Sequence, residues 1–111
     1  MTVREVVESL GLSVRAAERS LAHEVSGGVT CDLLSVVMSR ASKGDLWMTV
    51  QSHPNIVAVA VLAGLAGIVI THGFEPDPDT LSKAEEEGIP LLTTPASSFE
   101  VSGKLSTLGV H

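Results

Sequence analysis

Polar side chains that could bind a ligand or move a proton occur at three points of this sequence, each directly after a short apolar run. Hydroxyls, amides and imidazoles are the groups involved, and backbone turns that carry them can hold an anion or support acid–base chemistry. They are Gln51, Ser52, His53 and Asn55, then Thr71, His72 and Gly73, and finally Thr93 and Thr94. If the apolar runs are strands of one sheet, these groups form a single candidate binding site.

The stretch from Gly44 to Gly73 predicts the strand, helix and strand that would bring the first two groups together. Residues 46–50 are apolar and partly β-branched, and they end in a polar turn before Pro54, which suits the first turn of a helix. Residues 67–71 (GIVIT) are typical of a strand in a parallel sheet, and 89–92 predict a third. The carboxyl ends of parallel strands meet at one edge, where helix N-termini offer N–H groups to a ligand.

The remaining pattern predicts one α/β domain over residues 1–111, with a mainly parallel sheet flanked by helices. Thr2 and Glu5 predict a capping box for a helix that ends at Gly11. A further strand is expected at 12–16 and a short strand or a bulge at 24–29, with an uncertain connector between them.

Three more helices are expected from their capping residues and apolar spacing. One begins at Thr30 or Asp32, one is capped by Asp79 or Thr80 and ends at Gly88, and the last spans 98–108. The side chains expected to face the core from the first and last of these are Leu33, Leu34, Val37 and Met38, and Phe99, Val101, Leu105 and Leu108.

Charge and composition limit the classes of partner. A net charge of −6 argues against nucleic acid and anionic membranes, since both require a basic face. The uncharged run from Ile56 to Ile70 has 15 residues, fewer than the roughly 20 that cross a bilayer, so we expect no membrane span. A lone Cys31 and an amino terminus without a secretory pattern favour the cytoplasm.

No pattern in the chain predicts catalysis. The segment SFEVSGKL resembles a phosphate-binding P-loop but has Ser98 in place of the first glycine and Leu105 in place of the magnesium-binding hydroxyl. His53 and His72 could serve a metal or an acid–base step, but the spacing fits no metal motif, and we expect both rings to bond to turn backbone. Gln51 and Asn55 are expected to cap the helix near Pro54. No cofactor or metal is predicted.

Longer phrases of the sequence resemble the DRTGG domain family along nearly the whole chain. They are TVREVVESLGL, EVSGGVTCDLLSVVM, GDLWMTVQSHPNIVAVAVLAGLAGIVITHG and KAEEEGIPLLTTPASSFEVSGKLSTLGV. Of the motif that gives the family its name, Thr71 and Gly73 remain in this sequence, which is similar to the stand-alone subtype with W-x-T-x-Q-x-H.

The resemblance implies an α/β fold like the amino-terminal domain of HPr kinase/phosphorylase. Kinase activity in that family belongs to a separate P-loop domain, which this sequence does not contain. Other members accompany phosphotransacetylases and CBS-domain pyrophosphatases as regulatory or dimer-forming modules. Small stand-alone members are encoded near iron-only hydrogenase and electron-transfer subunits, which implies an accessory role and a redox-enzyme partner.

Three functional hypotheses follow. The first is a non-catalytic regulatory or interaction module, a homodimer because the chain has more apolar residues than one small core can use. The alternative is a sensor that binds a nucleotide or another phosphate compound through the three turns. The third is an enzyme with His53 or His72 as general base.

Overall fold

A computed structural model describes all 111 residues and shows one five-stranded sheet in the order β1-β5-β4-β3-β2. The strands β2 to β5 are parallel to one another, and β1 pairs antiparallel with β5 at the edge. The strands are β1 (Ser13–Ala16), β2 (Gly27–Thr30), β3 (Asp45–Thr49), β4 (Gly67–Ile70) and β5 (Leu91–Thr93). The predicted α/β fold with a mainly parallel sheet is therefore confirmed.

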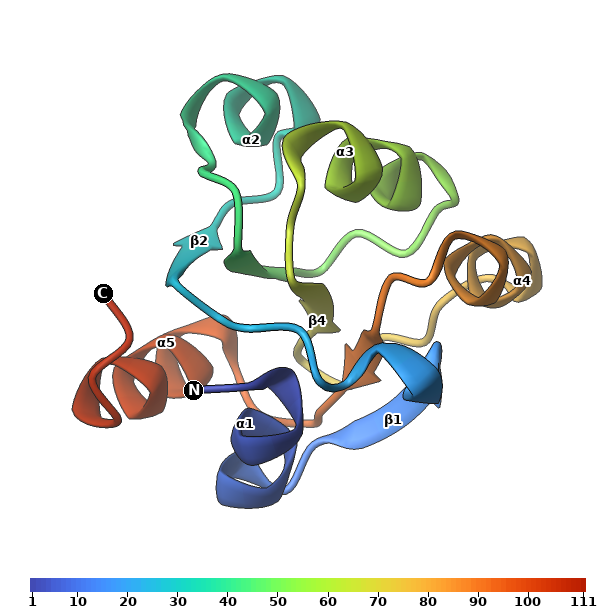
Figure 1. Cartoon of the computed structure of the whole chain (residues 1–111). Coiled ribbons are helices and arrows are strands. Elements are labelled where there is room, and N and C mark those ends of the chain that lie inside the picture. The colour runs from blue at the N-terminus through green and yellow to red at the C-terminus, as the bar shows by residue number, and fades with distance from the viewer.

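Helices cover both faces of this sheet, so the domain has three layers (Figure 1). Three helices lie on one face: α2 (Leu34–Arg40), α3 (Asn55–Ala63) and α4 (Pro78–Glu87). The other face carries α1 (Val3–Leu10) and α5 (Ser98–Thr107), and a short 3-10 turn, η1 (Glu18–Ser20), follows β1. Strands β2 to β5 are consecutive in the sheet, and right-handed crossovers place the three helices that connect them on the same face.

The two central strands are apolar on both sides because each side meets a helix layer. Every residue of β3 and β4 is buried. Trp47 and Ile68 pack with α2, α3 and α4, whereas Leu46 and Val69 pack with α1 and α5. Side chains of a strand alternate between faces, so only a strand buried on both sides can be a continuous apolar run.

Several helix boundaries differ from the sequence expectation because the expected caps have other partners. Helix α2 begins at Leu34, since the Asp32 carboxylate accepts bonds from Thr49 Oγ1 (2.8 Å) and the Val50 N–H (3.0 Å) instead of capping. Helix α4 begins at Pro78 with Asp77 as N-cap, one turn before Thr80, because proline suits the first helical position. The Thr2–Glu5 capping box and the Gly88 terminus are confirmed.

Four residues that were expected in the core are exposed, and these expectations were wrong. Leu33 is 65% exposed and Phe99 is 88% exposed, and Met38 and Leu108 are also on the surface. Helix α2 starts later than predicted and touches the sheet mainly through Val37, while α5 does so through Val101 and Leu105. The strands β2 and β5 are likewise shifted by two to three residues from the expected starts at 24 and 89.

The apolar run from Ile56 to Ile70 folds as α3 and β4, separated by a left-handed Gly64 that ends the helix. No helix in the structure combines the length and the hydropathy that spanning a bilayer demands.

Trp47 offers a direct test of the core on the α2–α4 face. Its indole N–H donates to the Cys31 carbonyl at 2.8 Å, and the side chain is fully buried. Trp47→Phe removes the donor and leaves that carbonyl unpaired, so we expect the free energy of unfolding to fall by about 1–3 kcal/mol. Urea denaturation measures this. The neighbouring Met48→Leu, which preserves volume, should cost less than about 1.5 kcal/mol, and an equal loss in both variants would contradict the hydrogen-bond argument.

Glu5 predicts a pH dependence of stability. Hydrogen bonds from the Thr2 N–H and hydroxyl to the Glu5 carboxylate lower the pKa of Glu5 from 4.5. A lowered folded-state pKa means that this stabilisation is present above the unfolded-state pKa and is lost as the pH falls through the lowered value. Circular dichroism recorded across the acid range should therefore show a less steep loss of structure in Glu5→Gln than in the wild type, and an equally steep loss would contradict the role of Glu5.

Candidate functional site

The ends of three strands lie side by side and carry the polar groups that the sequence singled out. Thr49 of β3 is in register with Ile70 of β4, which is in register with Thr93 of β5. The turns after these strands therefore lie along one edge of the sheet, where α3 and α5 begin. This shared edge was the assumption on which the sequence-based site depended.

Thr71 anchors this edge from the inside. Its side chain is completely buried, and Oγ1 lies 2.6 Å from Ser98 Oγ and 3.4 Å from the Thr49 carbonyl oxygen. Thr71 thus ties the start of α5 to β3 and β4, and it does not present its hydroxyl to solvent.

The backbone N–H groups of the second and third turns are also occupied within the chain. His72 N–H donates to the Ala96 carbonyl at 2.8 Å, and Gly73 N–H donates to the Thr94 carbonyl at 3.0 Å. Thr94 N–H donates back to the Ile70 carbonyl at 3.1 Å. These three amides hold the two turns together, so they are not available as donors to a phosphate.

His72 accepts the first N–H of helix α5, whose N-cap residue is Ser97. Its backbone is left-handed, with φ of 60°, and its Nε2 accepts the Ser98 N–H at 3.2 Å. That bond places the ring proton on Nδ1. The expectation that this imidazole bonds to turn backbone agrees with the geometry, and a ring nitrogen engaged at a helix N-terminus is not free to act as a general base.

His53 has a different partner from the one expected. Its Nδ1 lies 2.8 Å from Asp77 Oδ2, so the ring bonds to a carboxylate and not to turn backbone. The Ser52 carbonyl accepts the Asp77 N–H (3.1 Å) and the Thr80 hydroxyl (2.7 Å) in the same region. Together these bonds fasten the start of α4 to the turn after β3. No hydroxyl or thiol is bonded to the ring as a nucleophile would be.

The capping role expected for Gln51 and Asn55 was wrong. Gln51 Nε2 donates to the Asp32 carbonyl at 2.9 Å, which joins the turn after β3 to the loop after β2. Asn55 is the exposed first residue of α3, and the N-cap position is taken by Pro54, which has no side-chain donor or acceptor.

A cavity of about 520 Å³ opens at the carboxyl ends of β4 and β5, beside the edge strand β1. Gly73, Thr93 and Thr94, which the sequence singled out, belong to its lining. The other lining residues, which sequence reasoning missed, are Ser13, Arg15, Phe74, Glu75 and Pro95. Arg15 forms an ion pair with Glu75 there, and Phe74 is 54% exposed. The alternation of residues 13–16 places Ser13 and Arg15 on one face, but nothing in the sequence shows that this strand pairs with β5.

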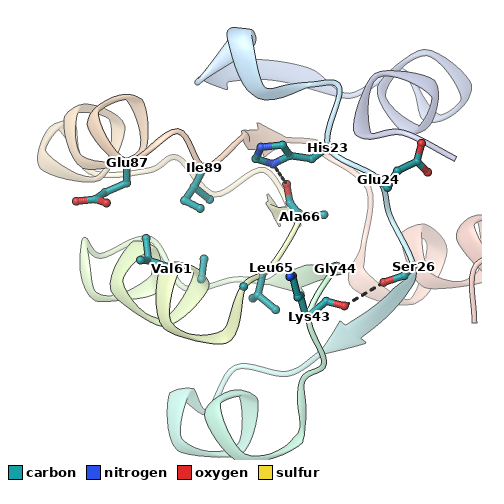
Figure 2. Close-up of a pocket in the computed structure, with 12 residues that line it drawn as sticks. His23, Glu24, Ser26, Lys43, Gly44, Val61, Leu65, Ala66, Glu87 and Ile89 are labelled. Carbon is teal, nitrogen blue, oxygen red and sulfur yellow. Dashed lines mark hydrogen bonds between the residues drawn. The ribbon is translucent and has the colours of Figure 1, made fainter.

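A second cavity, of about 590 Å³, lies at the opposite edge of the sheet, where the parallel strands begin. It contains none of the predicted site residues (Figure 2). Its lining is His23, Glu24, Ser26, Lys43, Gly44, Ala60, Val61, Gly64, Leu65, Ala66, Glu87 and Ile89. His23 Nδ1 lies 3.4 Å from the Ala66 carbonyl oxygen, and Ser26 Oγ donates to the Lys43 carbonyl at 3.0 Å.

The charges at this opposite edge are unfavourable for anions. Helices α3 and α4 end at the cavity, at Gly64 and Glu87, and helix C-termini carry partial negative charge. The Glu24 and Glu87 carboxylates add to it, and Lys43 is the one lysine or arginine of the lining. A phosphate is therefore better placed at the edge with Arg15.

Neither edge contains a metal-binding cluster. No three His, Cys, Asp or Glu side chains converge in the structure as a metal site would need.

The fold and these cavities define a small three-layer α/β domain with ligand-sized hollows at both edges of its sheet. The chain belongs to the DRTGG domain family, whose model matches residues 5–108. The resemblance inferred from the sequence is thereby confirmed.

A solved structure shares this fold across 94% of the chain, with a TM-score of 0.75 at 18% sequence identity. It is the regulatory region of Clostridium perfringens pyrophosphatase, comprising CBS and DRTGG domains, in complex with its activator diadenosine tetraphosphate. The present chain spans 45% of that structure's length. A search of curated protein sequences gave no significant match.

The role of His72 can be tested by substitution. His72→Ala removes the acceptor of the Ser98 N–H, so we expect the free energy of unfolding to fall by about 1–2 kcal/mol, as for the loss of a helix cap. His72→Asn, which tolerates the left-handed backbone and retains an acceptor, should recover part of this loss. His53→Ala is the control, because its pair with Asp77 is exposed and should contribute less than about 1 kcal/mol. Equal losses at both positions in urea denaturation would contradict the capping role.

Proposed function

We propose that this domain is a non-catalytic regulatory module that binds a nucleotide or a related phosphate compound at the carboxyl ends of β4 and β5. The observation that carries the proposal is the position of Arg15 in the cavity beside Thr93, Thr94 and Gly73. A guanidinium group binds phosphate through two parallel hydrogen bonds, and hydroxyl side chains add donors around it.

Binding of a phosphate to this chain requires such a local cation, because the net charge of −6 repels anions. In the structure Arg15 is paired with Glu75, whose side chain is 68% exposed. An exposed ion pair contributes little to stability, so a phosphate that carries more charge can replace the carboxylate at small cost. Binding would then release Glu75 and the segment between β4 and α4, which gives the ligand a means of changing the surface.

Phe74 supports a nucleotide in particular. It lies in the same lining, and its ring is available because 54% of the residue is exposed. Nucleobases stack on aromatic rings without regard to sequence. The complex of the Clostridium perfringens regulatory region with a dinucleoside tetraphosphate fits a ligand of this class.

The non-catalytic part of the proposal rests on the occupied histidines. His72 accepts a helix N–H. His53 pairs with Asp77, and no hydroxyl or thiol that could serve as a nucleophile is bonded to its ring. We further propose that the domain works in the cytoplasm as an accessory to a hydrogenase or another electron-transfer enzyme, as the family resemblance implies. The exposed side chains of Leu33, just before α2, and Leu62, on α3, are apolar surface that such a partner protein could cover.

Calorimetric titration with diadenosine tetraphosphate, ATP, AMP and inorganic phosphate tests the site. We expect saturable binding of at least one nucleotide, weakened by about tenfold or more in Arg15→Gln, since a hydrogen bond to a charged group contributes about 1.5–3 kcal/mol. At 100 times the dissociation constant the ligand should add about 2.7 kcal/mol to stability, which a thermal-shift assay detects as several degrees.

Lys43→Gln is the matched control, because it removes a cation from the cavity at the opposite edge. It should leave the affinity unchanged. If Lys43→Gln weakened binding and Arg15→Gln did not, the ligand would occupy the other cavity. If no compound bound the wild type, the sensor role would be wrong and the interaction module would remain the better hypothesis.

A further inference from the structure

Thr93 is an exception among the buried polar side chains of this chain. Six polar or charged side chains are buried, and five of them form hydrogen bonds within the chain, namely those of Asp45, Thr49, Thr71, Thr80 and Thr94. The hydroxyl of Thr93 forms none, although the residue is only 7% exposed. Buried polar groups are nearly always hydrogen-bonded, so an unpaired hydroxyl at the end of β5 requires an explanation.

The hydroxyl of Thr93 is open to the cavity at the carboxyl ends of β4 and β5. Thr93 belongs to the lining of that cavity, and no side-chain polar atom in the structure is both fully enclosed and unpaired. The hydroxyl therefore keeps some contact with solvent, which the cavity provides. A hydroxyl in this position is available to a ligand both as a donor and as an acceptor.

Ser13 adds a second free hydroxyl opposite the first. Ser13 of β1 is in register with Thr93 of β5 and lines the same cavity, and its hydroxyl also has no hydrogen bond within the chain. Residues directly opposite each other in an antiparallel pair have Cβ atoms about 4.5–5.5 Å apart on one face of the sheet. The two strands thus present a pair of neighbouring hydroxyls to the cavity.

A β-bulge sets Arg15 apart from this hydroxyl pair. The register between β1 and β5 shifts between Val14 and Ala16, so Arg15 is the extra residue of β1. Bulges of this kind re-aim a side chain, and they are frequent beside functional sites. The Arg15 side chain pairs with the Glu75 carboxylate, which accepts a hydrogen bond from no other group.

The Glu75 carboxylate marks the position at which an anion binds Arg15. Neither Ser13 nor Thr93 donates to that carboxylate, so the two hydroxyls do not reach the anion position. They are therefore free to bind a different part of the ligand whose phosphate replaces Glu75.

We propose that Ser13 and Thr93 bind the ribose hydroxyls of the nucleotide, and that the domain selects ribonucleotides over deoxyribonucleotides. The inference rests on the proposed function, because it assigns a further part of the same ligand. Arg15 binds the phosphate, Phe74 stacks on the base, and the ribose that joins them meets the hydroxyl pair. A guanidinium group and an aromatic ring do not distinguish ribose from deoxyribose. A hydroxyl pair does, because the 2′-hydroxyl both donates and accepts hydrogen bonds.

Calorimetric titration of the full chain with ATP, 2′-deoxy-ATP and tripolyphosphate tests the assignment. We expect the wild type to bind ATP about three- to tenfold more tightly than 2′-deoxy-ATP, which corresponds to one net hydrogen bond. The double variant with Ser13→Ala and Thr93→Val should abolish this preference. Its affinity for tripolyphosphate should equal that of the wild type, because only contacts to the sugar are removed.

Two further variants separate the sugar contacts from the phosphate contact and from folding. Arg15→Gln should weaken the binding of ATP and of tripolyphosphate alike. Thr107→Val, the same change as at Thr93 but on an exposed threonine of α5, should alter neither the affinities nor the preference for ATP. Thr93→Val should not lower the melting temperature, since the hydroxyl that it removes has no partner within the chain.

Two results would overturn the inference and leave the proposed function standing, provided that binding still depends on Arg15. Equal affinity of the wild type for ATP and 2′-deoxy-ATP would show that the hydroxyl pair does not contact the sugar. Loss of tripolyphosphate affinity in the double variant would assign the hydroxyls to the phosphate. If the wild type bound neither ATP nor tripolyphosphate, the inference and the phosphate site on which it rests would both be wrong.

Discussion

The structure depends on the burial of β3 and β4 on both of their faces. All nine residues of these two strands are buried, and a helix layer covers each face of the sheet. This constraint requires helices above and below the sheet, and it forces the chain to cross from β5 to the opposite face through α5. The start of α5 therefore lies beside the ends of β3 and β4, where Thr71 and His72 hold it.

Internal hydrogen bonds at the carboxyl edge decide where a ligand can bind. The hydroxyl of Thr71 and the amides of His72 and Gly73 already form hydrogen bonds that join the turns, so these groups are not available to a phosphate. Beside these turns the antiparallel strand β1 adds the side chains of Ser13 and Arg15 to a cavity that also contains Thr93 and Thr94. The two ends of the sheet also differ in charge, because helices begin at one edge and end at the other.

The sequence was sufficient for the architecture because its signals were local. Alternation, apolar runs and glycine termini predicted the parallel strands and all five α-helices to within a few residues. Rules based on neighbouring residues failed where a side chain bonds to a distant segment of the chain or points into solvent. Asp32 and Gln51 looked like helix caps, yet each bonds across to a neighbouring loop, and Phe99 had the spacing of a core residue but points outward.

What the sequence by itself determined was the set of chemical groups at the strand ends and the absence of a P-loop pattern. Only the tertiary structure decided which of those groups reach solvent. Gly73, Thr93 and Thr94 line a cavity with Arg15 and Phe74, while Thr71 is enclosed and His72 becomes a cap. The physical reason is that strand order and hydrogen-bond partners are long-range: the pairing of β1 with β5 joins residues about eighty positions apart, and no periodicity within either segment records it.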